Sequence, residues 1–205
     1  MKLNLPTKIT LVRLFLIPVF IAVFCIEAIP YRYAVAAGVF VLAAITDAID
    51  GHIARSRNLV TNLGKFLDPI ADKVLISTAM ILLLAMREEL CSCFAGAENA
   101  VYLALAVCVC IIMARELIIS AFRQIAAVTG FVMAADKLGK IKAAVQDISV
   151  VFLFVGGAFY ETVFGLVCLY IGYALFAAAT VLTVWSGISY IVKNKAVLDD
   201  PVNQQ

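Results

Sequence analysis

Charged residues are scarce in this sequence: they make up 15% of its 205 residues, whereas 64% are hydrophobic. So little charge excludes a separate water-soluble domain, because such domains carry far more charge on their surfaces. Histidine is almost absent, since His52 is the only one. A metal centre built from several imidazoles is therefore excluded, and His52 is interpreted as a bystander rather than a ligand.

Cysteine is also used sparingly, and its distribution argues against a disulfide framework. Cys25, Cys108, Cys110 and Cys168 fall in apolar stretches, where a small polarizable side chain packs well. Cys91 and Cys93 stand apart from these with only Ser92 between them. Two cysteines with no histidine nearby are too few for a zinc site. We therefore expect all six to be free thiols.

Long apolar stretches dominate what is present, and the mean hydropathy is +1.05. A helix that crosses a bilayer needs about 20 mostly apolar residues. The pattern predicts six such spans, at 10–29, 33–54, 68–87, 100–123, 144–162 and 166–192. We predict an all-α, polytopic membrane protein with a single domain over residues 1–205, an amphipathic N-terminal segment and a polar tail at 193–205.

The distribution of positive charge predicts the orientation of these spans. If both termini are cytoplasmic, 14 of the 16 lysine and arginine residues lie on the cytoplasmic side. They are Lys2, Lys8, Arg13, Arg55, Arg57, Lys65, Lys73, Arg115, Arg123, Lys137, Lys140, Lys142, Lys193 and Lys195. Only Arg32 and Arg87 remain on the other side. We therefore predict a multi-pass protein with both termini in the cytoplasm.

Four aspartates lie within or beside the apolar stretches, where a charge costs a few kcal/mol. Asp47 and Asp50 are three residues apart, and Asp68 and Asp72 are four apart, so each pair shares one face of a helix. Two such helices that face each other would gather four carboxylates. Carboxylates this close repel unless cations lie between them, and oxygen ligands suit Mg²⁺, Mn²⁺ or Ca²⁺. A divalent-cation transporter is the alternative from another class, but a conduit would spread its acids through the membrane depth.

The acidic stretch also carries a longer pattern, Asp47-x2-Asp50-Gly51-x2-Ala54-Arg55-x8-Gly64-x3-Asp68-x3-Asp72. This pattern resembles the signature of the CDP-alcohol phosphotransferase family at each of its fixed positions. The resemblance implies an enzyme in which an alcohol hydroxyl displaces CMP from a CDP-linked lipid. It implies two ions of Mg²⁺ or Mn²⁺ on the four aspartates, with Asp72 also the catalytic base. It further implies CDP binding by Asp47, Gly51, Ala54, Arg55 and Gly64.

A second set of polar residues concerns the acceptor alcohol. Arg115 and Arg123 are eight residues apart in the predicted fourth span, so they share a face, and Lys140 follows on the same side of the membrane. Two or three cations beside the metal site would favour an anionic acceptor. We predict that Arg115, Arg123 and Lys140 hold the phosphate of a sugar-alcohol phosphate.

Two further segments narrow the resemblance within the family. Thr10-Leu11-Val12-Arg13 and Ala114-Arg115-Glu116-Leu117 resemble segments of bacterial phosphatidylglycerophosphate synthases. This resemblance implies CDP-diacylglycerol and sn-glycerol 3-phosphate as substrates, in the lipid bilayer of a bacterial plasma membrane. Inositol phosphate or phosphatidylglycerol are the alternative acceptors. Glycines in the last two spans predict close helix contact or a homodimer face. We expect no nucleic-acid partner.

Overall fold

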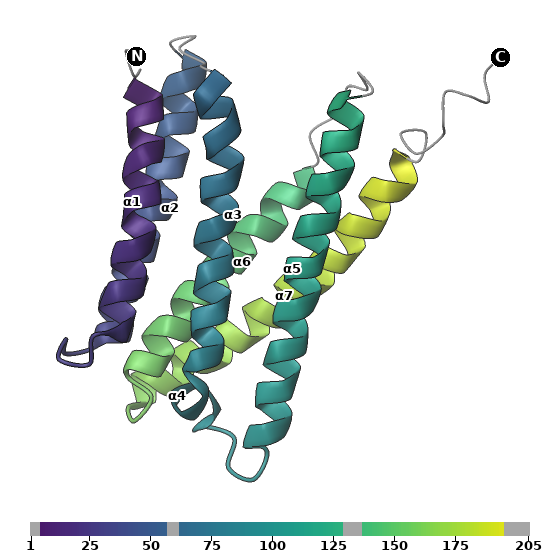
Figure 1. The fold of residues 1–205 in the computed structure, drawn as a ribbon. Helices are drawn as coiled ribbons and strands as arrows, with labels where there is room; N and C mark the ends of the chain where they lie inside the picture. The colour runs from purple at the N-terminus through teal and green to yellow at the C-terminus, as the bar shows by residue number, and fades with distance from the viewer. Residues whose placement is uncertain (1–4, 57–61, 129–136, 195–205) are drawn as a thin grey trace.

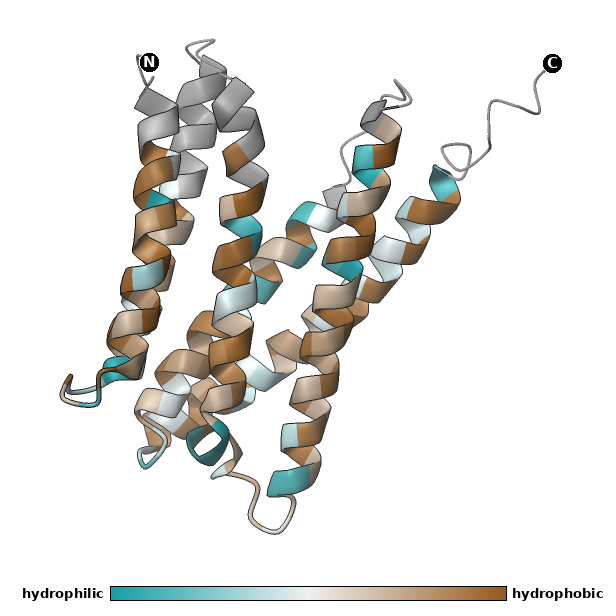
Figure 2. Cartoon of the chain, in the orientation of Figure 1, coloured by the Kyte–Doolittle hydropathy of each residue, from teal (hydrophilic) through white to brown (hydrophobic). Residues whose placement is uncertain are grey.

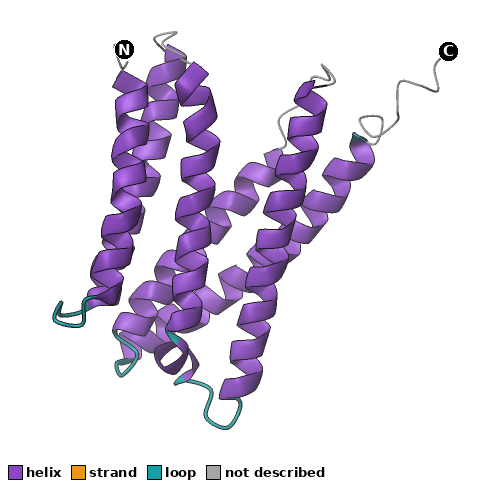
Figure 3. Ribbon diagram, in the orientation of Figure 1, coloured by secondary structure: helices purple, strands orange, loops and turns teal. Residues whose placement is uncertain are grey.

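The chain folds into a bundle of helices, seen here in a computed structural model that describes residues 5–56, 62–128 and 137–194 (Figure 1). Every regular element within these ranges is a helix (Figure 3). The helices are α1 (Leu5–Cys25), α2 (Arg32–Ser56), α3 (Asn62–Ala85), α4 (Arg87–Cys91), α5 (Glu98–Val128), α6 (Lys137–Ala158) and α7 (Val163–Lys193). The all-α prediction is confirmed for this part of the chain.

Six long helices correspond to the six predicted spans, and the short α4 is additional. Three of them contain segments that are long and apolar enough to cross a membrane: Glu98–Ala126, Leu138–Ala158 and Val163–Lys193. Two shorter apolar segments, Ile9–Cys25 and Arg32–Thr46, lie in α1 and α2. The helices and their apolar character therefore agree with a membrane protein.

Two helices begin six or seven residues earlier than the apolar pattern predicts. α3 begins at Asn62 rather than residue 68, and α6 begins at Lys137 rather than residue 144. Both early turns are polar, so hydropathy alone does not detect them, although polar residues continue a helix without difficulty. α1 runs without a break from Leu5, so any amphipathic N-terminal segment from there on is continuous with the first long helix.

The core lies where α1, α2, α3 and α6 meet, and aromatic rings fill it. Phe20, Phe40 and Phe154 are buried, and the Phe20 ring centroid lies 6.1 Å from that of Phe40 and 5.6 Å from that of Phe154. The outer surface is apolar as well: Phe15 and Trp185 are 78% and 69% exposed. Brown, hydrophobic residues accordingly cover much of every long helix in Figure 2. Helices that are hydrophobic on all sides are typical of a bundle surrounded by lipid.

Glycines set the close packing of α6 against α7. A Cβ at Gly156 would lie 2.8 Å from the Leu169 backbone nitrogen, and a Cβ at Gly172 would lie 3.1 Å from that of Leu153. Only glycine permits so close an approach of the two backbones. The predicted helix contact is therefore found within one chain, and these glycines do not themselves indicate a dimer face.

The cysteines are free thiols, as predicted. Cys91 is buried at the end of α4, and Cys93 is partly buried just after it. Burial raises the pKa of both thiols. The protonated form is therefore favoured, and it is the less reactive form.

Candidate functional site

The predicted acidic pattern falls on two contacting helices, α2 and α3, that follow each other in the chain. The last ten residues of α2 carry Asp47, Asp50, Gly51, Ala54 and Arg55, and the first eleven of α3 carry Gly64, Asp68 and Asp72. Because the chain reverses direction between the helices, both halves of the pattern lie at the same end of the bundle (Figure 1). Of these eight side chains the structure describes Asp72, and the other seven lie outside its described side chains.

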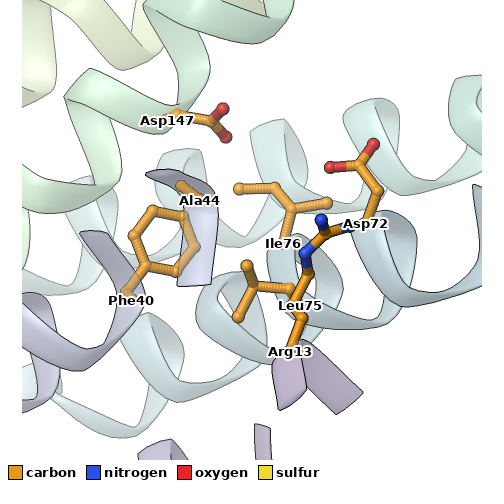
Figure 4. Close-up of a pocket in the computed structure, with 7 residues that line it drawn as sticks. All are labelled: Arg13, Phe40, Ala44, Asp72, Leu75, Ile76 and Asp147. Carbon is orange, nitrogen blue, oxygen red and sulfur yellow. The ribbon is translucent and has the colours of Figure 1, made fainter. Parts of the chain in front are cut away.

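Asp72 is exposed and lines a small pocket between four helices (Figure 4). The other residues that line it are Arg13 from α1, Phe40 and Ala44 from α2, Leu75 and Ile76 from α3, and Asp147 from α6. Asp72, the predicted base, is thus accessible. It lies where α2 and α3, the helices that carry the acidic pattern, meet α1 and α6.

Two charged residues of this pocket, Arg13 and Asp147, were not predicted from the sequence as members of the site. Figure 4 shows the Arg13 guanidinium and the Asp72 carboxylate directed into the same space, with the Asp147 carboxylate across from them. Arg13 is fully buried, and its guanidinium keeps its charge, so nearby carboxylates are needed to offset the cost of burial. Asp147 lies in the predicted fifth span, and a carboxylate inside a membrane span is the signal that identifies it.

The donors at this pocket suit a hard divalent cation. Asp72 and Asp147 offer carboxylate oxygens, and the described lining contains no cysteine or histidine. Oxygen ligands favour Mg²⁺ or Mn²⁺, whereas sulfur or imidazole would favour zinc. The type of donor therefore fits the predicted kind of metal, and the described residues bring together two such carboxylates here and no group of three or more potential ligands. Asp47, Asp50 and Asp68, the remaining predicted ligands, lie outside the described side chains.

A second polar cluster joins α5, α6 and α7. Arg115 donates from Nη1 to Glu116 Oε1 at 3.1 Å and from Nη2 to Ser186 Oγ at 2.9 Å. Lys142 on α6 also donates to Glu116 Oε1. The Lys142 side chain and Ser186 are buried, and hydrophilic stretches interrupt the brown surfaces of α5 and α6 in Figure 2. The Glu116 carboxylate therefore accepts from cations of two helices, α5 and α6. One of these cations, Arg115, also donates to a residue of the third helix, α7.

The three residues predicted to bind the acceptor phosphate differ in their surroundings. Arg115 belongs to the cluster just described. Arg123 donates from Nε to the Tyr190 hydroxyl at 3.1 Å, so it too is held against α7. Lys140 is exposed on α6, and it is Lys142 that reaches Glu116. The two arginines thus share the α7 side of α5, as their spacing predicts. Glu116, Lys142, Ser186 and Tyr190 are additions that only the packing reveals.

We expect Gly187→Ala to disturb the position of Arg115. A Cβ at Gly187 would lie 3.1 Å from Arg115 Cγ and 3.3 Å from its Nε, which is tighter than ordinary packing. Overpacking of this kind typically costs about 1–3 kcal/mol, so the variant should unfold at lower denaturant concentration in detergent. Gly38→Ala is the matched control, because nothing lies within 4 Å of a Cβ there. Equal stability of the two variants would contradict the tight packing of Arg115 on α7.

Comparison with known proteins identifies relatives over almost the whole chain. The sequence model of the CDP-alcohol phosphatidyltransferase family matches residues 3–185. A Bacillus subtilis protein named CDP-diacylglycerol–glycerol-3-phosphate 3-phosphatidyltransferase is 39% identical, over 93% of this chain and 95% of its own. The Escherichia coli protein of the same name is 37% identical, over 98% of this chain and all of its own. The family match includes Asp72 and its pocket, and also Arg115, Glu116 and Lys142 of the second cluster, whereas Ser186 lies just beyond it.

Proposed function

The chain belongs to the CDP-alcohol phosphatidyltransferase family, and from this premise we propose that it transfers the phosphatidyl group of CDP-diacylglycerol to sn-glycerol 3-phosphate. The products are phosphatidylglycerophosphate and CMP. The observation that carries the proposal is the full-length similarity to bacterial proteins named for this reaction, at 37–39% identity. The acidic pattern on α2 and α3 supports it, because displacement at a pyrophosphate needs cations that neutralise its charge, and carboxylates can hold such cations.

The reaction is a substitution at phosphorus. The hydroxyl oxygen of glycerol 3-phosphate forms a bond to the β-phosphorus of CDP-diacylglycerol, and the bond from that phosphorus to the bridging oxygen breaks. CMP leaves with the bridging oxygen and its electron pair. The hydroxyl proton moves to the Asp72 carboxylate, which is exposed at its pocket and therefore accessible to an incoming alcohol.

We assign the remaining roles in the acidic pattern as its residue types suggest. Asp47, Asp50, Asp68 and Asp72 would hold two ions of Mg²⁺ or Mn²⁺. When bound, such ions neutralise charge on the attacking and leaving oxygens. Gly51, Ala54 and Gly64 leave room for the nucleotide, Asp47 also contacts CDP, and Arg55 donates to its phosphates.

The acceptor phosphate is assigned to Arg115, Arg123 and Lys140. The packing supports the two arginines most directly, because Ser186 and Tyr190 of α7 fix the directions of their guanidinium groups. Lys140 is exposed on α6 and supplies a further positive charge near the same end of the bundle. A phosphate held by several cations would favour an anionic acceptor over free glycerol.

Arg123→Ala should raise KM for glycerol 3-phosphate at least tenfold while leaving KM for CDP-diacylglycerol near its wild-type value. The reason is the loss of a charge-assisted hydrogen bond to phosphate, typically about 1.5–3 kcal/mol. Steady-state kinetics in mixed micelles measures both constants. Arg123→Lys should rescue only partly, because it lacks the planar fork. Tyr190→Phe is the control, because it removes only the hydroxyl that accepts from Arg123 and keeps the arginine itself. If Arg123→Ala raised KM for CDP-diacylglycerol more than KM for glycerol 3-phosphate, Arg123 would instead be assigned to binding of the lipid substrate.

We further propose six membrane spans with both termini in the cytoplasm of a bacterium, in its plasma membrane. The start of α1 and the end of α7 lie at the same end of the bundle in Figure 1, as an even number of spans requires. Most lysines and arginines of the sequence then face the cytoplasm. The relatives named above are bacterial. A homodimer stays a prediction.

The direct test uses purified protein, labelled CDP-diacylglycerol and one acceptor at a time. Release of CMP should require glycerol 3-phosphate, with far lower release for glycerol, inositol phosphate or phosphatidylglycerol. If transfer to one of the other acceptors were efficient instead, the proposed phosphatidyl transfer would stand and the proposed acceptor would be wrong. A protein that moves divalent cations across vesicles and releases no CMP would refute the proposed function.

A further inference from the structure

In the second polar cluster, formed by Arg115, Glu116, Lys142 and Ser186, one oxygen of the Glu116 carboxylate accepts from two cations. Arg115 Nη1 lies 3.1 Å from Glu116 Oε1, and Lys142 Nζ contacts that same atom. Glu116 is a quarter exposed, whereas the Lys142 side chain is almost entirely buried. The carboxylate therefore stands between a cation of its own helix and one that reaches across from α6.

The energetic need for Glu116 follows from the burial of Lys142. An ammonium group removed from water is costly unless a negative charge and hydrogen bonds replace its hydration. Glu116 is the acidic partner that the structure gives Lys142. Without it, two positive charges from α5 and α6 would face each other in a poorly hydrated space, and each would move away from the other.

The position of Arg115 depends on the same carboxylate. Ser186 holds one end of its guanidinium and Glu116 holds the other, so the plane of the group is fixed between α5 and α7. Gly187 leaves just enough room for the stem of the side chain. Removing either partner would leave Arg115 with one anchor, and a single anchor lets the group rotate.

We propose that Glu116 is a positioning residue for acceptor binding: it holds Arg115 and Lys142 in the places from which they attract the phosphate of the acceptor. This inference rests on the proposed function and adds two residues, Glu116 and Lys142, to its acceptor side. The combined charge of the three groups is +1, so the cluster remains attractive to an anion. Glu116 itself does not touch the reacting atoms.

The test is Glu116→Gln, which keeps the shape of the side chain and removes its charge. We expect KM for glycerol 3-phosphate to rise about tenfold or more, as the loss of one charged anchor implies, with KM for CDP-diacylglycerol unchanged. Glu116→Asp should recover part of the loss. Glu161→Gln is the matched control, because Glu161 is exposed in the connection between α6 and α7 and contacts Tyr160. Its kinetics should match the wild type.

The double variant Glu116→Gln/Lys142→Met separates positioning from plain stability. Removing both charges of the pair should restore the thermal stability lost in Glu116→Gln, because no buried charge is then left alone. KM for glycerol 3-phosphate should stay high, because Arg115 is still without its anchor and Lys142 is gone. Recovery of both stability and KM would overturn the proposal and leave a structural ion pair.

Failure of this inference is distinguishable from failure of the proposed function. If the wild type releases no CMP with glycerol 3-phosphate, the proposed acceptor is wrong, and the inference fails with it. If the wild type uses glycerol 3-phosphate and Glu116→Gln has an unchanged KM for it, the function stands and the positioning role is wrong. An equal rise of both KM values would also overturn it.

Discussion

Asp72→Asn lowers kcat by about 10²–10⁴ while CDP-diacylglycerol still binds, if Asp72 takes the proton from the acceptor hydroxyl. Asparagine has nearly the same shape, but its amide does not accept that proton at neutral pH. The exposed position of Asp72 at a pocket between α1, α2, α3 and α6 makes the carboxylate accessible to the alcohol. Single-turnover release of CMP measures the chemical step, and equilibrium binding of a CDP analogue measures the nucleotide site.

Asp147→Asn is the informative comparison, because Asp147 is the second carboxylate that lines the same pocket (Figure 4). We expect a much smaller loss of kcat from it than from Asp72→Asn. If Asp147→Asn has the larger effect and nucleotide binding persists in both variants, the base is Asp147. If Asp72→Asn abolishes nucleotide binding together with turnover, Asp72 is chiefly a metal ligand and its assignment as base is wrong.

The helices were predictable from sequence wherever apolar residues run long enough to cross a bilayer. Hydropathy located all six long helices, including the division of the last apolar stretch into α6 and α7. It missed the polar first turns of α3 and α6, because hydropathy measures fit to lipid and not the capacity to form a helix. It also missed α4, whose five residues are too few for a periodic signal.

The candidate site was predictable to the extent that its residues are close in sequence. The acidic pattern spans 26 residues on two consecutive helices, so its spacing alone groups the aspartates. Arg115 and Arg123 were found for the same reason, since they share one helical face. The contacts of Glu116 with Lys142 and of Arg115 with Ser186 join residues 26 and 71 positions apart. No local pattern encodes such pairs, because they depend on how α6 and α7 cross α5.

Arg13 and Asp147 illustrate a different limit. Both lie inside predicted spans, and a charge within a membrane span is by itself a signal of function. Positive charge near a cytoplasmic end also has an ordinary explanation as a topological anchor, and this explanation fits Arg13 equally well from sequence. Its complete burial beside a pocket with two carboxylates distinguishes the two explanations. Burial depends on the packing of four helices, which no local sequence pattern encodes.

Removal of divalent metal should abolish CMP release. An excess of EDTA takes away the cations that the aspartates of α2 and α3 are proposed to hold, and the charge on the pyrophosphate is then left without compensation. Mg²⁺ or Mn²⁺ added beyond the EDTA should restore activity. Zn²⁺ should restore little, because zinc favours sulfur and imidazole, and the donors proposed here are carboxylates.

Asp68→Asn tests the metal requirement at a single proposed ligand. An amide oxygen keeps the size of the ligand but lacks its negative charge, so the variant should show almost no turnover and should need far more Mg²⁺ for what remains. Direct titration with Mn²⁺, followed by electron paramagnetic resonance, reports metal affinity independently of activity. Glu161→Gln, at the opposite end of the bundle, should bind Mn²⁺ as the wild type does. Full activity in excess EDTA, or unchanged Mn²⁺ affinity in Asp68→Asn, would remove the metal from this site and leave the four aspartates to be explained by charge pairing with residues such as Arg13.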